Sequence, residues 1–253
     1  MGERVALGPR ARFALRLTAT GFVFGSEDDA RRAGTIPGTR LANAVAPLGV
    51  TAQRYESVRP APRTPLGATA HTRFLVCPYD PSGRVRAANV LRVLALLVPR
   101  HPDLQLVMLG PGTEDGDLRM HAAALRITKH VTFLGPRDDA LSIYALADLG
   151  WVVANGDNGA FGALDLMGSR VPVIAERGTP AQLYVPDGIA GLLLPPGGAH
   201  EAAAAIARLL AHEEQRSAMG AAGRTKVARD HSETAMVEAF ERAAALASDR
   251  AQW

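Results

Sequence analysis

The chain has 253 residues, of which 47% are hydrophobic and 21% are charged, with one cysteine and a net charge of +3. This balance is that of a globular protein and excludes wholesale disorder, and one cysteine excludes a disulfide framework or a metal site of several cysteines. The 28 basic residues include only two lysines, and they are dispersed without interleaved aromatic residues, so we expect no nucleic-acid partner. No apolar run approaches the roughly 18 residues of a membrane span.

The N-terminal part of the chain shows short, irregular elements. Residues 4–17 have a mixed apolar and arginine pattern that indicates a helix, and Ser26, followed by three acids, indicates the start of another. Short strands are expected at 21–24 and 41–46. Three prolines within residues 59–65 then predict an extended linker, because proline fixes φ.

Beyond the linker, strands and helices alternate regularly. Short apolar runs predict strands at 74–77, 104–109, 131–133, 150–154, 171–175 and 191–194. Helical periodicity predicts helices at 85–97, 118–127, 140–147 and 160–167, and in the alanine-rich stretch from 200 to about 248. Such βαβ units, with right-handed crossovers, form a doubly wound parallel sheet. We therefore expect an α/β fold with a Rossmann-like domain over 67–230, and a C-terminal helix at 231–253 packed back on the first 60 residues.

The loops that follow the strands are the natural place for a ligand, because open parallel sheets bind ligands at the carboxyl ends of their strands. All of them contain glycine; they are 78–84, 110–116, 135–139, 155–159, 176–180 and 195–198. Glycine permits tight turns and close backbone approach, and helix N-termini favour phosphate. Gly110 and Gly112 match the dinucleotide fingerprint only in part, so the glycines alone do not identify a ligand.

Two acids, Asp157 and Asp165, are the most informative pair. Asp157 is expected in a loop, and Asp165 about one turn into the following helix, so both carboxylates can face the ligand crevice. The alternative is that Asp157 or Asn158 caps the helix and Asp165 lies on a solvated helix face.

The wider context favours the first interpretation. The stretch from Asp157 to Ala175 resembles the segment of retaining glycosyltransferases of family 4 (glycosyl transferases group 1) in which seven residues separate two glutamates. Other segments resemble that family in the same order, at 80–83, 100–104, 107–112, 131–135, 147–149, 178–180, 187–188, 191–197, 216–220 and 231–232. The resemblance covers residues 70–230 and implies the C-terminal, donor-binding domain of the GT-B fold.

The N-terminal segment also resembles this family. Residues 19–26 and 44–50 are similar to the last strands of the family's N-terminal domain. The resemblance implies that residues 1–66 are a remnant of that domain with its linker, and that a separate domain or chain binds the acceptor. We also expect self-association through the truncated N-terminal region, because an incomplete sheet exposes an unpaired edge.

The resemblance implies a nucleotide-diphospho-sugar as donor substrate, without a metal or a cofactor. It assigns Asp157 to the transferred sugar as the catalytic residue and Asp165 to the ribose hydroxyls, and a carboxylate suits a diol because it accepts two hydrogen bonds. The loop at 135–137 would meet the base, and the glycine-rich turns with the helix start near Ala160 would meet the diphosphate. The expected donor-binding residues are Asp165, Asn158, Gly159, Ala160, Phe161, Arg84, Gly110, Gly112, Gly135 and Arg137.

The sequence departs from the family at charged positions. Both glutamates are aspartates, which reach about one C–C bond less far, and the family's phosphate-binding arginine and lysine fall at Pro78 and Gly83. Arg84 and Arg86 are the candidates to replace them, although an arginine is not a lysine point charge.

Different functions therefore remain open. The first is the donor-binding half of a retaining glycosyltransferase, inactive alone, whose acceptor the sequence does not identify. The second is a degenerate, non-catalytic nucleotide-sugar-binding or scaffold module, and a GT-B epimerase or phosphorylase is a third. The N-terminal residues show no export-signal pattern, which predicts a cytoplasmic protein, peripheral to the inner face of the membrane where a partner supplies the contact.

Overall fold

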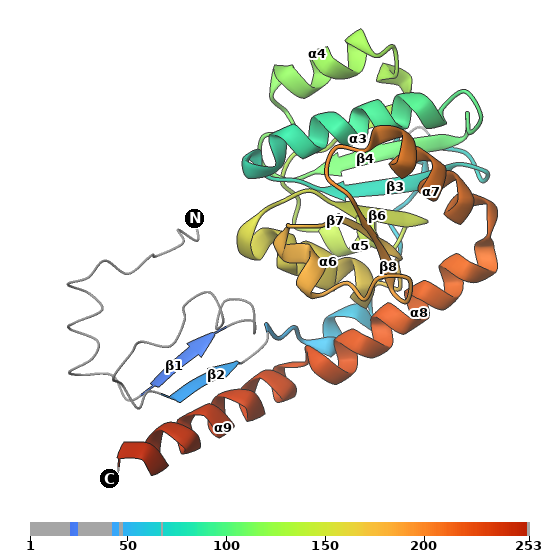
Figure 1. Ribbon diagram of the computed structural model, residues 1–253. Coiled ribbons are helices and arrows are strands. Elements are labelled where there is room, and N and C mark those ends of the chain that lie inside the picture. The colour runs from blue at the N-terminus through green and yellow to red at the C-terminus, as the bar shows by residue number, and fades with distance from the viewer. Residues whose placement is uncertain (1–20, 25–41, 46–47, 67, 252–253) are drawn as a thin grey trace, which may run out of the picture. The chain divides into compact units, whose positions relative to one another are not determined.

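The computed structural model describes residues 21–24, 42–45, 48–66 and 68–251 (Figure 1). The chain divides into two compact units, a terminal unit of residues 1–52 and 227–253 and a central unit of residues 53–226. The helices expected at 4–17 and after Ser26 lie outside the described residues.

The central unit is built on a six-stranded parallel sheet with the order β5-β4-β3-β6-β7-β8. Its strands are β3 (Arg73–Pro78), β4 (Leu104–Leu109), β5 (Val131–Phe133), β6 (Leu149–Val152), β7 (Val173–Glu176) and β8 (Gly191–Leu194). The register pairs Val76 with Val107 and with Gly150. Nearly all residues of the central strands are buried, as expected for a parallel sheet covered on both faces.

Helices cover the two faces of this sheet, which confirms the predicted doubly wound α/β fold (Figure 1). One layer contains α3 (Arg84–Leu97), α4 (Gly116–Ala124) and α7 (Ala199–Ala211), and the other contains α5 (Ala140–Tyr144) and α6 (Gly156–Gly168). Helix α8 (Glu213–Asp230) follows α7. The short 3-10 helices are η1 (Ala52–Tyr55), η2 (Thr64–Leu66), η3 (Pro81–Gly83), η4 (Thr128–His130) and η5 (Pro180–Leu183).

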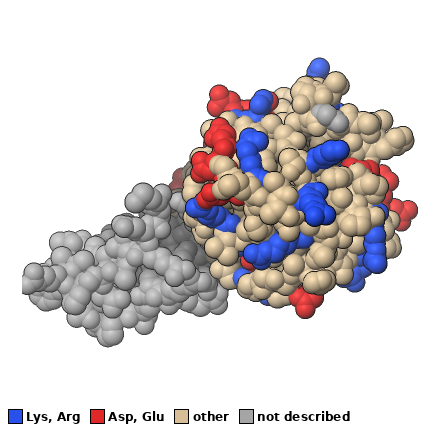
Figure 2. Space-filling model, turned by 90° about the horizontal axis from the view of Figure 1, so that it is seen from above, with Lys and Arg blue, Asp and Glu red and all other residues tan. Residues whose placement is uncertain are grey.

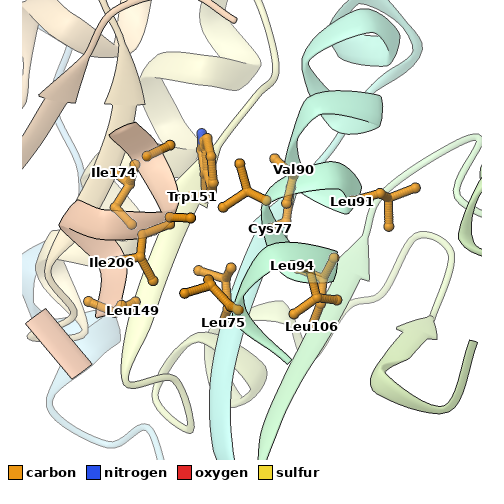
Figure 3. Close-up of a cluster of buried hydrophobic side chains, with 14 of the residues drawn as sticks. Leu75, Cys77, Val90, Leu91, Leu94, Leu106, Leu149, Trp151, Ile174 and Ile206 are labelled. Atoms are coloured by element: carbon orange, nitrogen blue, oxygen red, sulfur yellow. The ribbon is translucent and has the colours of Figure 1, made fainter. Parts of the chain in front are cut away.

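The main hydrophobic core lies between the sheet and the α3–α7 layer (Figure 3). Alternate strand residues point into it and meet apolar side chains of α3 and α7; the labelled members are Leu75, Cys77, Leu106, Leu149, Trp151, Ile174, Val90, Leu91, Leu94 and Ile206. Each fully buried side chain of this size contributes about 1.5–3 kcal/mol to folding. Burial raises the pKa of the Cys77 thiol, so this cysteine packs as a small apolar residue.

The terminal unit contains a two-stranded parallel sheet of β1 (Gly21–Phe24) and β2 (Ala42–Val45). The last helix, α9 (Glu233–Ala251), packs against both strands, which confirms that the C-terminal helix returns to the N-terminal segment. Two further bonds join the ends of this unit, because Val50 N donates to the His231 carbonyl at 2.7 Å and His231 Nδ1 lies 3.1 Å from the Leu48 carbonyl. That residues 1–66 are the remnant of a second domain remains a prediction.

Three helices differ from their predicted bounds by three residues or more; α5, predicted at 140–147, ends at Tyr144. Helix α6 begins at Gly156, four residues before the predicted start, so Asp157 is the second residue of a helix and the expectation that it lies in a loop was wrong. Asn155, in an extended conformation, is the N-cap residue by position; its side chain makes no capping hydrogen bond and is held instead by Arg86 and the Ser82 carbonyl. Helix α4 ends at Ala124 because Arg126 adopts a left-handed conformation, with φ at 59°.

No helix in the described ranges has the length and apolar character needed to cross a membrane.

Candidate functional site

A cavity of about 310 Å³ opens at the carboxyl ends of β3, β4 and β6, where a doubly wound fold binds its ligands. The strand ends and the following loops supply Pro78, Tyr79, Leu109, Gly110, Pro111, Pro136, Arg137 and Ala154. Helices α5 and α6 supply Ala140, Tyr144, Asn158, Phe161, Gly162 and Asp165. Five predicted site residues therefore line one cavity: Gly110, Arg137, Asn158, Phe161 and Asp165.

Asp165 is the acid among the described residues that line the cavity. Its side chain is only 15% exposed, and it accepts a hydrogen bond from the Tyr55 hydroxyl at 2.7 Å. Arg54 lies 3.6 Å from its other oxygen. Burial raises the pKa of the Asp165 carboxyl, and the Tyr55 hydrogen bond and the Arg54 charge oppose that rise. The alternative in which Asp165 lies on a solvated helix face is therefore wrong.

The first turn of α6 is tied to the loop after β3. Asn158 Nδ2 donates to Asp80 Oδ2 at 3.0 Å, and Asp80 also accepts the Ser82 backbone N–H at 2.9 Å. A Cβ on Gly159 would lie 2.4 Å from the Ala154 carbonyl oxygen, so this position needs glycine for α6 to pass so close to β6. Ala160 is buried beside it. The segment that carries Asp157 therefore starts from a fixed helix N-terminus.

One predicted glycine, Gly110, lies on the opposite wall, and a second, Gly135, holds it in place. Gly110 N donates to the Gly135 carbonyl at 2.8 Å, and both residues have positive φ, 128° and 68°. A Cβ on Gly110 would lie 2.0 Å from the Tyr79 carbonyl oxygen, so no larger residue fits there. Gly112 also has positive φ, at 83°, but neither it nor Gly135 lines the cavity.

The arginines near the cavity are already engaged. Arg84 forms an exposed ion pair with Asp117, and Arg137 forms one with Asp139 at 2.6 Å. Arg86 donates to the Val153 carbonyl at 3.0 Å and to the Asn155 side chain. Arg137 is therefore the one cation among the described residues that line the cavity, and Arg86 acts as a brace for the β6–α6 connection.

The surface charge is mixed on the face shown in Figure 2, where basic side chains are separated by uncharged surface and by acids. On this face, basic residues do not form one continuous patch.

Sequence reasoning missed three tyrosines of the site, of which Tyr79 lines the cavity directly after β3. Tyr55 lies 110 residues before Asp165 in the chain, and no spacing or motif links the two. Tyr144, on α5, lines the cavity, and burial followed by the Asp165 charge raises the pKa of its hydroxyl. A second cavity, of about 410 Å³, is lined by Tyr55, Arg170 and Arg224 among others and contains none of the predicted site residues.

Comparison with known proteins gives a consistent result. Residues 83–226 match the family model described as Glycosyl transferases group 1. The chain is 30% identical over 172 residues to D-inositol 3-phosphate glycosyltransferase of Corynebacterium glutamicum, in a match that covers 62% of this chain and 40% of the relative. The chain therefore spans less than half the length of that curated relative.

Solved structures show the same fold. The crystal structure of Anabaena Alr3699/HepE in complex with UDP superposes with a TM-score of 0.75 at 20% identity, covering 94% of this chain and 66% of that one. The C-terminal domain of a glycosyl transferase group 1 family protein (LpcC) from Francisella tularensis superposes with a TM-score of 0.60 at 18% identity, covering 73% of this chain and 100% of that domain. The chain thus includes a counterpart to that entire C-terminal domain.

Proposed function

The chain belongs to the glycosyl transferases group 1 family, and we propose that its central unit binds a nucleotide-diphospho-sugar in the cavity at the ends of β3, β4 and β6 and supplies the donor for sugar transfer with retention. The observation that carries this proposal is a carboxylate with 15% exposure, Asp165, at the position of the family's ribose-binding acid and on the wall of that cavity. The UDP bound in the HepE structure supports the choice of ligand class.

Different residues of the cavity contact the ribose, the base and the diphosphate of the ligand. Asp165 accepts hydrogen bonds from the ribose diol, and the loop of Pro136 and Arg137 lies against the base. The N-terminus of α6 and the turn at Gly110 lie against the diphosphate, because exposed helix N–H groups and the helix dipole favour anions. Asp157, the second residue of α6, is assigned to the transferred sugar.

Sugar transfer breaks the bond between the anomeric carbon and a diphosphate oxygen, so negative charge builds up on the leaving diphosphate. Preorganised cations and N–H groups stabilise such charge. Arg84 is the better candidate for this role than Arg86. Its ion pair with Asp117 is exposed on both sides, at 57% and 54%, and exposed pairs contribute only about 0–1 kcal/mol, so Arg84 can exchange Asp117 for a phosphate. Arg86 would have to give up the Val153 carbonyl.

A non-catalytic nucleotide-sugar-binding module is the second candidate. The observation that favours it is the loss of charge where the family has two cations, since Pro78 lines the cavity without a charge and Gly83 is buried against Val153. A separate acceptor-binding domain or chain is part of the first proposal, and the cytoplasmic location at the inner membrane face stays a prediction.

Two measurements test these proposals. Calorimetric titration of the full chain with UDP, GDP and ADP, and then with sugar derivatives of the base that binds, tests donor binding. Asp157→Ala is expected to leave affinity for the nucleoside diphosphate within about twofold of the unmodified chain and to weaken the nucleotide sugar by a larger factor. Absence of binding to all nucleotides would overturn both candidates.

Sugar transfer separates the two candidates from each other. We expect transfer when the chain is co-expressed with the proteins encoded next to it, and loss of transfer in Arg84→Ala while nucleotide binding persists. Nucleotide-sugar binding without transfer under the same conditions would favour the non-catalytic module.

A further inference from the structure

Tyr55 is held in place from three directions. It is buried in η1, and two arginine guanidinium groups pack on its ring, Arg54 at 5.6 Å and Arg224 at 5.0 Å from the ring centroid. The ring also packs on Gly168 so closely that a Cβ there would lie 2.5 Å from Tyr55 Cζ. A ring fixed in this way gives its hydroxyl a defined position.

That hydroxyl points at the acid of the cavity. Tyr55 donates to Asp165 Oδ1 at 2.7 Å, and Arg54 lies near Oδ2 at 3.6 Å. Each carboxylate oxygen has two lone pairs, so both oxygens keep an acceptor site for a ligand after these contacts. The hydroxyl bond also limits the rotation of the Asp165 side chain.

We propose that Tyr55 is a positioning residue for nucleotide binding: its hydroxyl orients the Asp165 carboxylate, so that the outer lone pairs accept the ribose diol. This inference rests on the proposed function, because it assumes that Asp165 receives the ribose. Tyr55 itself does not line the cavity, and it acts through Asp165.

The charges and hydrogen bonds around Asp165 determine in which direction its pKa moves when the Tyr55 hydroxyl is removed. The groups that face Asp165 are Tyr55 and Arg54 from η1 and Tyr144 from α5. Burial raises the pKa of Asp165, and only the Tyr55 hydrogen bond and the Arg54 charge lower it. Without the hydroxyl the pKa of Asp165 rises further, so the carboxyl gains its proton at a higher pH. A protonated carboxyl loses acceptor strength and no longer suits a diol.

The test is UDP affinity, measured by calorimetry on the full chain between pH 5.5 and 8.5, or GDP or ADP affinity if that nucleotide binds tighter. Tyr55→Phe keeps the ring on Gly168 and removes only the hydroxyl. We expect it to weaken binding about threefold at pH 8.5 and about tenfold or more at pH 5.5. Tyr184→Phe removes another buried tyrosine hydroxyl, away from the cavity lining, and should follow the unmodified chain throughout.

A second variant covers the case in which Tyr55→Phe does not fold, as judged by circular dichroism. Arg54 is 42% exposed, so Arg54→Gln should fold and shift the pH profile in the same direction by a smaller amount. In the Asp165→Ala background, Tyr55→Phe should have no further effect on affinity.

The outcomes separate this inference from the proposed function. Unchanged affinity in Tyr55→Phe at every pH from 5.5 to 8.5 would overturn the positioning role, even if Asp165→Ala weakens binding. Unchanged affinity in Asp165→Ala would overturn the proposed ribose contact and the positioning role with it. Weaker affinity in Tyr55→Phe, by a ratio that grows as the pH falls, together with full coupling to Asp165, supports both.

Discussion

The α6 side and the β3–α3 side of the cavity differ in their charged groups and in the contacts that hold those groups in place. On the α6 side, Asp165 is only 15% exposed and is held by Tyr55 and Arg54. On the β3–α3 side, Pro78 and Gly83 carry no charge, Arg84 is paired with an exposed aspartate, and Arg86 serves the backbone. Under the proposed function, the chain keeps the carboxylate suited to a nucleoside and lacks two cations suited to a diphosphate, so nucleoside recognition and leaving-group stabilisation are separable in this cavity.

The largest expected effect concerns the α6 side of the cavity, which carries Asp165 and is called the acid side below. A hydrogen bond to a charged group contributes about 1.5–3 kcal/mol, so Asp165→Ala should weaken binding of a nucleoside diphosphate about 10- to 150-fold. Arg84→Ala should weaken it less than about fivefold, because its ion pair is exposed. Calorimetry on both variants checks the order, and a larger loss in Arg84→Ala would reverse the comparison.

On the β3–α3 side of the cavity, the fold should not accept a lysine at position 83, where related enzymes have one. A Cβ on Gly83 would lie 2.3 Å from the Val153 carbonyl oxygen, which is backbone and cannot rotate away. Gly83→Lys should therefore lower the free energy of unfolding by about 1–3 kcal/mol, the usual cost of overpacking. Urea denaturation measures this loss. Gly116→Lys is the control, because a Cβ there has open space around it. Equal stability of the two variants would show that the lost lysine is not excluded by the fold.

The fold should accept an arginine at position 78, because the side chain there lines the cavity. Pro78→Arg places a cation beside the proposed diphosphate site and should tighten nucleoside diphosphate binding about fivefold, or about 1 kcal/mol. The gain should shrink at high salt, because screening weakens partly exposed charge pairs. The corresponding nucleoside, which has no phosphate, should bind both proteins equally. An equal gain for the nucleoside would place the new arginine away from the diphosphate.

The order of strands and helices in the central unit could be predicted from the sequence because each apolar run or periodic stretch is local. Six predicted strands match β3 to β8 within two residues at each end. The start of α6 was misplaced because Gly156 and Gly159 weaken the helical pattern, whereas the tertiary contacts of Asn155 and Gly159 decide it.

The site was predictable only in part, for a related reason. Gly110, on a strand-end loop, and Asp165, on the helix α6 that follows β6, both follow from the rule that ligands bind at the carboxyl ends of parallel strands. The contact between Tyr55 and Asp165 depends on chain folding across 110 residues, which no local pattern encodes. In the same way, the competition of Asp117 for Arg84 and of Val153 for Arg86 is visible only once α3, α4 and β6 are in place.

The smallest expected effect concerns stability on the acid side. The pKa of Asp165 is raised in the folded chain, so its ionisation opposes folding: the associated stability is present at low pH and is lost as pH rises through the folded pKa. Asp165→Asn removes the charge and keeps an oxygen that can accept from Tyr55. This variant should therefore melt at the same temperature as the unmodified chain at pH 4 and at a higher temperature at pH 8. Nucleotide binding should be weakened in the same variant, because an amide accepts hydrogen bonds on one atom only. Differential scanning calorimetry at the two pH values measures the difference. A lower melting temperature of Asp165→Asn at pH 8 would show that the Tyr55 and Arg54 contacts outweigh the cost of burial, and that the acid side of the cavity is stabilised by its charge.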